Sequence, residues 1–377
     1  MRDDLFQKEL LLLDGGLGTT LEDEHNVKFC ADTPLWSSHL LVENTSTLEA
    51  VQRDFANAGA DIILTATYQA SFRAFRNTKV PKQDGIGTSD AVRYMLSAVK
   101  IARQAFNGRP GLVALSLGAY GATMVPSTEY SGNYGLMNEG DLYTFHSERI
   151  SVFKDSSEWK EIDVVAFETL PRIDEVRIAR RVMKGVIDRE YWISCVFPND
   201  DQRLPDGTSI EELVSVMLTG ERPPFAVGIN CTKIHKVAGL IRKYEEAARK
   251  LSLELPKLVF YPDGAGRKVY DTAVQQWIGD DSDQKPWHDQ ISDIVREVQH
   301  RGAWEGIIVG GCCKTAPGHI KKLRQSFGIM MPSSPPSGPS SDVFDMCLAF
   351  DEELIVNGDV VLMELSLLLT WCPAIMA

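Results

Sequence analysis

The feature that most constrains the fold is a series of eight short apolar runs, each followed by a polar or glycine-rich turn and then a helical pattern. The runs cover residues 10–14, 61–65, 112–117, 163–168, 192–197, 225–230, 257–261 and 306–310. They show little alternation of apolar and polar residues, which is typical of strands buried on both faces. Strands that alternate with helices predict a parallel sheet covered by helices.

Eight such units favour an α/β protein built as a single (β/α)8 barrel, the TIM-barrel architecture. The alternative is a doubly wound open sheet. It is less favoured because the first run is followed by Gly15, Gly16 and Gly18, a spacing that fits neither the dinucleotide-binding fingerprint nor the P-loop.

Several helix ends can be predicted. Residues 46–49 (STLE) have the pattern of a capping box for a helix that stops at Gly59, and Ser209 with Glu212 predicts another helix start. The stretches 173–183 and 236–251 are amphipathic, with Arg and Lys on the outer face.

The end of the chain departs from this rhythm. We predict a barrel over residues 1–328, a Pro/Ser-rich linker over 329–342 and an irregular C-terminal tail over 343–377. The linker reads MMPSSPPSGPSS at its centre, a composition that cannot bury a core. The tail is apolar but has no strand–helix rhythm, and no role follows from its sequence.

Charge and composition exclude several classes of partner. The chain has 39 basic and 52 acidic residues, a formal charge of −13, which argues against nucleic acid and anionic membranes as partners. The N-terminal residues lack the apolar segment of a secretory signal, and the apolar stretch 360–377 falls short of a membrane span. Seven cysteines are an odd number, so we expect reduced thiols in the cytoplasm rather than a disulfide framework. No sequence feature indicates an oligomeric state.

Three cysteines lie where strands should end. Cys231 follows the sixth run, and Cys312 and Cys313 follow the eighth. The carboxyl ends of barrel strands form the active site, so these distant residues are expected to meet there, and three thiolates suit zinc. Adjacent residues of a straight strand point to opposite faces, so the chain must bend, with Gly310 and Gly311 supplying the freedom.

Cysteine is also a common small core residue, which is the alternative interpretation of any one thiol. We expect this role for the four remaining cysteines, which are Cys30, Cys195, Cys347 and Cys372.

Two carboxylates also end strands. Asp14 ends the first run and Glu168 the fourth. Asp14 could simply bond the amides of its own glycine turn, and Glu168 could cap the helix after Pro171. Alternatively, both bind the ammonium group of an amino-acid substrate. The residues by themselves leave both interpretations open.

Aromatic residues are frequent in the segments expected near the barrel mouth. They are Trp36, Tyr68, Tyr120, Tyr130 and Tyr134. Most aromatic side chains serve packing, but a cationic ligand would be attracted to their faces.

Six segments together resemble the zinc-dependent homocysteine S-methyltransferase family. They are LLLDGGLGTTLED (11–23), GADIILTATYQAS (59–71), GAYGATMVPSTEYSGNYG (118–135), AFETLPRIDE (166–175), VGINC (227–231) and IIVGGCCKTAPGHI (307–320). The resemblance runs from about residue 11 to 323 and leaves the tail outside.

The resemblance implies a (β/α)8 barrel whose zinc ion is bound by the three cysteines named above, with the homocysteine sulfur as a further ligand. It also implies that Asp14, Glu168 and the backbone near Gly15 hold the amino-acid group of homocysteine. We expect Asn230, next to the first zinc cysteine, to contact this substrate as well.

The implied reaction transfers a methyl group from a sulfonium donor, S-methylmethionine or S-adenosylmethionine, to the homocysteine thiolate and yields methionine. We expect Trp36 and Tyr68 to contact the donor. A betaine-dependent enzyme, a non-enzymatic zinc or thiol redox sensor and a metal-free lyase or aldolase are the alternatives. A sensor has no use for Asp14 and Glu168 at the same mouth, and an aldolase should place a lysine at a strand end, where we find none convincing.

Overall fold

Eight parallel strands form the centre of the computed structural model, which describes residues 2–29, 34–80, 83–271, 276–279 and 285–331. The strands are β1 (Leu10–Leu12), β2 (Ile62–Leu64), β5 (Leu112–Gly118), β6 (Val164–Leu170), β7 (Glu190–Cys195), β8 (Ala226–Asn230), β9 (Lys257–Tyr261) and β12 (Ile307–Val309). They pair in the order β1-β12-β9-β8-β7-β6-β5-β2. A parallel bridge between Leu13 and Ile62 joins the two ends of this series, so the sheet curls into a barrel. The predicted strand count and fold class are confirmed.

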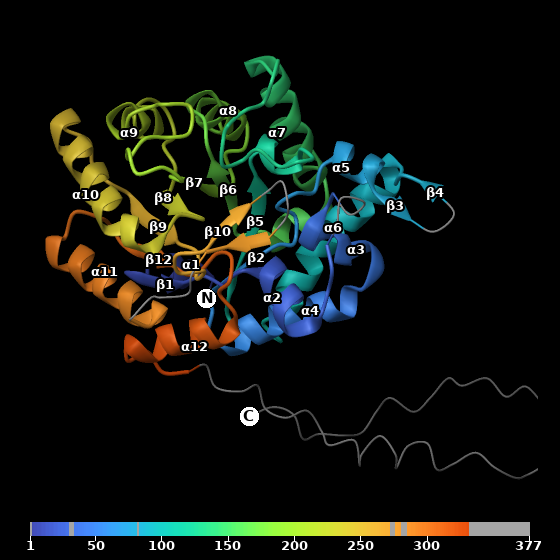
Figure 1. Ribbon diagram of the computed structural model, residues 1–377, viewed down its shortest axis with the longest axis horizontal. Coiled ribbons are helices and arrows are strands. Elements are labelled where there is room, and N and C mark those ends of the chain that lie inside the picture. Colours follow the sequence, from blue (N-terminus) through green and yellow to red (C-terminus); the bar gives the residue numbers. More distant parts are fainter. Residues whose placement is uncertain (1, 30–33, 81–82, 272–275, 280–284, 332–377) are drawn as a thin grey trace, which may run out of the picture. The chain divides into compact units, whose positions relative to one another are not determined.

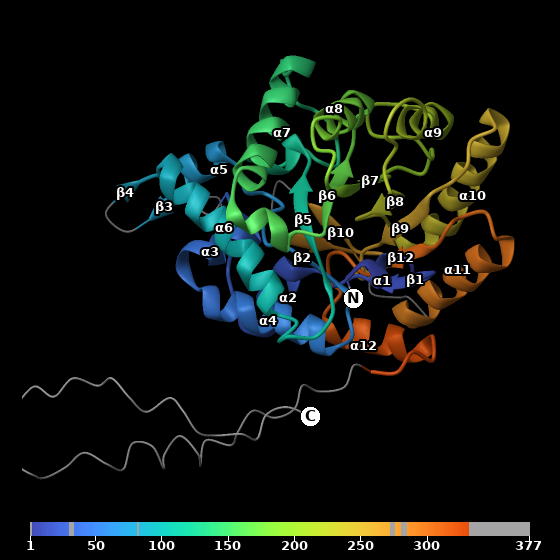
Figure 2. The same ribbon diagram turned by 180° about the vertical axis from the view of Figure 1, so that it is seen from behind.

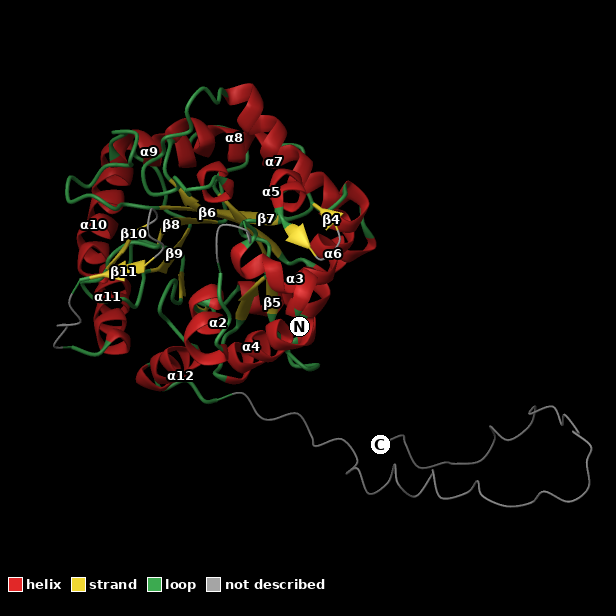
Figure 3. Ribbon diagram, turned by 45° about the vertical axis from the view of Figure 1, so that its right-hand side comes forward, coloured by secondary structure: helices red, strands yellow, loops and turns green. Residues whose placement is uncertain are grey.

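Helices surround the strands, and Figure 3 shows them as an outer ring. The longer ones that flank the barrel in Figures 1 and 2 are α2 (Leu17–His25), α4 (Thr45–Asn57), α6 (Thr88–Gln104), α7 (Glu139–Lys154), α8 (Ile173–Met183), α9 (Ile210–Leu218), α10 (Ile234–Leu251), α11 (Trp287–Arg301) and α12 (Pro317–Ser326). Shorter elements are α1 (Arg2–Phe6), α3 (Leu40–Glu43), α5 (Phe72–Asn77) and the 3-10 helices η1 (Trp36–His39), η2 (Tyr120–Thr123) and η3 (Ser157–Glu161). Two antiparallel pairs, β3 (Lys79–Val80) with β4 (Gln83–Asp84) and β10 (Val269–Asp271) with β11 (Gln276–Ile278), extend from loops.

The buried apolar side chains form two layers. One cluster fills the barrel interior with alternate residues of the strands, among them Leu11, Val164 and Trp192. The other lies between the strands and the helices and includes residues such as Phe167. A sheet covered on both faces explains why the strand sequences are almost continuously apolar. Because the interior is packed with side chains, the only place for chemistry is the rim of the barrel.

Helix ends agree with prediction in two cases and differ in one. The Ser209 side chain accepts a hydrogen bond from the Glu212 amide and caps α9 as expected, and α8 spans the predicted residues 173–183. The predicted capping box at 46–49 is wrong, because Asn44 caps α4 by accepting from the Thr47 amide. Asparagine competes well with serine as an N-cap, and here it comes first along the chain.

Among the described residues, none of the helices combines the length and apolarity that a bilayer crossing requires. The predicted tail at 343–377, almost all of the predicted linker, and Cys30, Cys347 and Cys372 lie outside the described residues. The described Cys195 is fully buried in the core between strands and helices, as expected.

Candidate active site and metal centre

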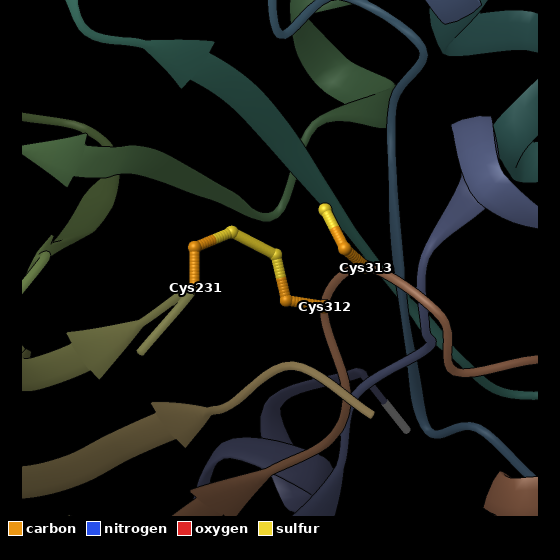
Figure 4. Close-up of side chains that lie close together, drawn as sticks. All are labelled: Cys231, Cys312 and Cys313. Atoms are coloured by element: carbon orange, nitrogen blue, oxygen red, sulfur yellow. A yellow bond between two sulfur atoms is a disulfide. The ribbon is translucent and has the colours of Figure 1, made fainter. Parts of the chain in front are cut away.

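Three sulfur atoms meet at the carboxyl end of the barrel. Cys231 directly follows β8, and Cys312 and Cys313 lie in the loop after β12 (Figure 4). The three Sγ atoms lie within 4.8 Å of one another, and all three residues line the same cavity. The barrel therefore brings together residues that are about eighty positions apart in the chain.

The bend that lets both adjacent cysteines face this cavity has a different cause from the predicted one. Gly310 and Gly311 do not adopt positive φ, whereas Cys231 (φ 45°) and Lys314 (φ 59°) do. The glycines are required by close packing instead. A Cβ at Gly310 would lie 2.6 Å from the carbonyl oxygen of Asp14, and one at Gly311 would lie 2.1 Å from the Thr315 hydroxyl oxygen.

Two of the three sulfurs are covalently joined, which differs from the expectation that all thiols are reduced. Cys231 and Cys312 form a disulfide, with their Cα atoms 5.5 Å apart, while Cys313 is free (Figure 4). Strand ends that converge so closely place the two sulfurs either for a direct bond or for sharing one cation. Thiolates are the form that ligates a metal, so metal binding requires this disulfide to be reduced.

Asp14 and Glu168 line the same cavity and are almost completely buried, with 3% and 4% of their surface exposed. The Leu64 amide donates to Asp14 Oδ2 at 2.8 Å, whereas Oδ1 has no hydrogen-bond partner among the described residues. Glu168 accepts hydrogen bonds from the hydroxyls of Ser116 and Tyr261. The alternative roles are not observed among the described residues, where neither carboxylate accepts a hydrogen bond from the turn amides after Asp14 or from the start of α8.

Burial raises the pKa of both groups. For Asp14 the rise is large and the negative charge of Glu168 adds to it, while for Glu168 the pKa reaches about 7 despite the opposing hydrogen bonds and the nearby Arg149 guanidinium. A cation placed between the two carboxylates would relieve this destabilisation of their charged forms. The pair is therefore suited to bind the ammonium group of an amino acid.

Asn230 and Gly15 also line the cavity. The Asn230 side chain accepts from the Thr169 amide at 2.8 Å and donates to the Thr169 hydroxyl at 2.7 Å. Its amide group thus ties the end of β8 to the end of β6, immediately beside Glu168. Gly15 needs its small size, because a Cβ there would approach the Thr315 carbonyl oxygen to 2.5 Å.

The aromatic residues expected at the mouth divide into two groups. Trp36, Tyr68 and Tyr130 line the cavity, but Tyr120 and Tyr134 do not. Tyr134 instead donates its hydroxyl hydrogen to Glu175 Oε2 at 2.6 Å, and Tyr120 packs edge-on against it. The cavity also contains aromatic residues that the sequence analysis did not single out, namely Phe29, Tyr261 and Trp277.

The charge of the lining is uniformly negative. Two further carboxylates, Glu22 and Glu129, line the cavity beside Asp14 and Glu168, and no Lys, Arg or His is among its described lining residues. Glu129 was not predicted as a site residue, because no pattern in residues 118–135 sets it apart from other loop acids. An acidic, aromatic cavity favours cationic ligands.

The surroundings of the three sulfurs fit a bound metal cation. Burial, followed by the negative charges of Asp263, Glu129 and Glu22, raises the pKa of the Cys313 thiol to about 12. Such a thiol becomes a thiolate at neutral pH only with a strong positive charge beside it. Cys231, Cys312 and Cys313 would hold such an ion, and three soft sulfur ligands suit zinc.

Comparison with known proteins identifies the family of the chain. The family model described as homocysteine S-methyltransferase matches residues 11–327. The chain belongs to the homocysteine S-methyltransferase family. The homocysteine S-methyltransferase 4 of Zea mays is 30% identical over 331 residues, which cover 84% of this chain and 88% of that protein.

Solved structures of a member of this family are similar as well. The crystal structure of the homocysteine methyltransferase MmuM from Escherichia coli in its metallated form superposes with a TM-score of 0.67 at 27% identity, covering 86% of this chain and 98% of that one. Its oxidized form gives a TM-score of 0.66 at 28% identity, covering 85% and 96%.

Proposed function

We propose that this homocysteine S-methyltransferase family member transfers a methyl group from a sulfonium donor, S-methylmethionine or S-adenosylmethionine, to the sulfur of homocysteine in a zinc-dependent reaction that yields methionine. The observation that carries the proposal is the convergence of three cysteine sulfurs and two buried carboxylates in one cavity without a basic lining residue among those described. The sulfurs suit an ion and a thiol ligand, and the carboxylates suit the ammonium group of the acceptor.

The protein would orient the amino-acid group of homocysteine. Asp14 and Glu168 bind the ammonium group, and the backbone of Gly15 can approach homocysteine closely because glycine has no side chain. Asn230 holds the Thr169 backbone, and with it the position of Glu168. Zinc, when bound by Cys231, Cys312 and Cys313, supplies the Lewis acidity that lowers the pKa of a coordinated thiol.

The chemical step needs no general acid. The acceptor sulfur attacks the methyl carbon in line, a new carbon–sulfur bond forms, and the electron pair of the broken bond goes to the donor sulfur. That sulfur leaves as a neutral thioether and takes up no proton. Accordingly, the described lining of the cavity contains no histidine.

Net charge favours the sulfonium donors over the alternatives. S-methylmethionine and S-adenosylmethionine each carry a net positive charge, betaine is neutral overall, and methylfolate is an anion. The lining contains four carboxylates and no described basic residue, so an anionic donor would be repelled. Trp36 and Tyr68 supply aromatic faces that would attract the sulfonium.

A donor panel tests the proposal. Purified protein is reduced, loaded with zinc and supplied with homocysteine and one of S-methylmethionine, S-adenosylmethionine, betaine or methylfolate, and the methionine formed is measured. We expect turnover with one or both sulfonium donors and none with the other two. Turnover with betaine or methylfolate alone would contradict the donor assignment.

Since metal thiolates require reduced cysteines, we also propose that the protein works in the cytoplasm.

A thiol redox sensor is the second candidate, and the Cys231–Cys312 disulfide is the observation that favours it. A sensor would not need the acidic and aromatic lining, whereas an enzyme would. The same panel separates the two, because a sensor would bind metal without forming methionine from any donor.

A further inference from the structure

Glu129 is a buried carboxylate to which the reaction described above gives no role. It lies in the segment between β5 and α7, its surface is only 8% exposed, and it lines the active-site cavity. Its negative charge raises the pKa values of Cys313, Tyr68 and Tyr130. Glu129 therefore shares the cavity with the sulfur centre and with Tyr68 and Tyr130, and a methyl donor must enter this cavity to reach the acceptor sulfur.

The Glu129 carboxylate is only partly satisfied. The Ser127 side chain and the Glu129 backbone amide donate hydrogen bonds to it, but Oε2 is buried without a partner among the described residues. Burial raises the pKa of Glu129 to about 7 in spite of these bonds. A buried charge is normally paired, so an unpartnered carboxylate oxygen in a binding cavity calls for a cationic partner that comes with a ligand.

The loop that carries Glu129 is attached to α8. The fully buried Glu175 carboxylate accepts hydrogen bonds from the Tyr120 amide at 2.7 Å and from the Tyr134 hydroxyl at 2.6 Å, and it contacts His146 Nε2 at 2.9 Å. Tyr120 and Tyr134 flank Glu129 along the chain, so both ends of its loop are attached to α8. This attachment limits the movement of the loop that carries Glu129 before any ligand binds.

We propose that Glu129 is the residue that recognises the positive charge on the donor sulfur, an assignment that rests on the proposed function. Asp14 and Glu168 form a separate acidic pair whose charges act on each other, and we assign that pair to the acceptor ammonium. Tyr68 and Tyr130, on which the Glu129 charge acts directly, supply the aromatic faces of the same donor site.

This role has a consequence for donor and product discrimination. Before transfer the donor sulfur is a cation; after the carbon–sulfur bond breaks, the bonding electron pair stays on that sulfur and it becomes a neutral thioether. Glu129 therefore attracts the donor but not the demethylated product. Because the positive charge is already partly lost in the transition state, Glu129 stabilises the bound donor more than the transition state, so its loss should raise KM and should not lower kcat.

The test compares ligands that differ only in the sulfonium. S-methylmethionine and methionine share their ammonium and carboxylate groups, so their affinities for reduced, zinc-loaded protein are measured by calorimetry for the wild type and for Glu129→Gln. We expect Glu129→Gln to weaken S-methylmethionine binding by about tenfold or more, equivalent to about 1.4 kcal/mol, and methionine binding by less than about twofold. The donor KM should rise by about the same factor while kcat stays the same or increases, and Glu129→Asp should recover part of the lost affinity.

The matched control is Glu158→Gln. Glu158 is buried to the same degree, with 9% of its surface exposed, but it pairs with Lys100 away from the cavity. We expect the Glu158→Gln variant to have the donor affinity of the wild type. Because Glu129→Gln removes a buried charge, it should not lower the melting temperature.

Each other outcome overturns the assignment. An equal loss for S-methylmethionine and methionine would place Glu129 on the ammonium group, and an unchanged donor KM would show that it makes no donor contact. A lower melting temperature with weaker homocysteine binding would make Glu129 structural. If the wild type itself transfers no methyl group from either sulfonium donor, the proposed function fails, which is a different result from a normal wild type with an insensitive Glu129→Gln variant.

Discussion

Replacing Glu168 by glutamine should make the protein more stable and a weaker binder of homocysteine. The side chain is 4% exposed, and it accepts hydrogen bonds from the Ser116 and Tyr261 hydroxyls. Glutamine keeps an oxygen that can accept these bonds but cannot become charged. The substitution therefore isolates the effect of the negative charge in this buried position.

The stability effect depends on pH in a defined direction. Burial raises the pKa of Glu168 from 4.5 to about 7, so between these values the native state retains a proton that the unfolded chain has released. The contribution of Glu168 to the free energy of unfolding therefore falls as the pH rises through this window. The full rise corresponds to a loss of up to about 3 kcal/mol above the raised pKa. Glu168→Gln lacks this loss, so it should match the wild type near pH 4.5 and exceed its stability at pH 8.

The binding effect has the opposite sign. A hydrogen bond to a charged group contributes about 1.5–3 kcal/mol, so losing the carboxylate should raise the homocysteine Kd by roughly 10- to 100-fold. Zinc content should be unchanged, since Glu168 is not one of the sulfur ligands.

Urea unfolding at pH 5 and pH 8, with calorimetric titration of homocysteine, measures both effects. Glu158→Gln is the control, because its hydrogen bond from Lys100 lowers the pKa of Glu158 instead of raising it. That variant should show no gain in stability at pH 8 and normal homocysteine affinity. A Glu168→Gln protein with the same stability difference at both pH values, or with unchanged homocysteine affinity, would refute the reasoning.

Three further substitutions have definite expected outcomes. Gly310→Ala should lower the free energy of unfolding in urea by about 1–3 kcal/mol and reduce the zinc content, because the added Cβ would lie 2.6 Å from the Asp14 carbonyl oxygen. A normal zinc content in this variant would contradict the expectation. Asn230→Ala should cost about 1–3 kcal/mol in the same assay, because it leaves the buried Thr169 amide unpaired while the Thr169 hydroxyl keeps its hydrogen bond with Tyr68. A loss below about 1 kcal/mol would show that water replaces the amide. Trp36→Ala should raise the donor KM but not the homocysteine KM in steady-state kinetics, and the reverse pattern would place Trp36 on the acceptor side.

The barrel could be predicted from the sequence because its signals are local. Each strand is a short apolar run, and the carboxyl end of each run shows which residues can reach the rim, so Cys231 and Cys312 could be expected to meet. The details of the bend could not be predicted, since the positive φ values fall on Cys231 and Lys314 rather than on the glycines. These backbone angles depend on how closely the loop after β12 packs against β1, which is a tertiary property.

The residues behind the site were not predictable for a similar reason. Glu175 and His146 are buried polar groups whose hydrogen-bond partners lie on other elements, and nothing in their local sequence reveals this. Glu129 is one acid among many in a loop, and it becomes distinctive only through its burial. Likewise, Tyr120 and Tyr134 could not be separated from the cavity-lining Tyr130 before their partners were known.

Metal analysis of the reduced protein tests whether the sulfurs of Cys231, Cys312 and Cys313 hold one zinc ion. We expect about one zinc per chain in the wild type and in Cys195→Ala, whose sulfur is buried in the core. We expect far less zinc in Cys313→Ala, although that variant remains folded. Full zinc content in folded Cys313→Ala, or none in the reduced wild type, would contradict this assignment.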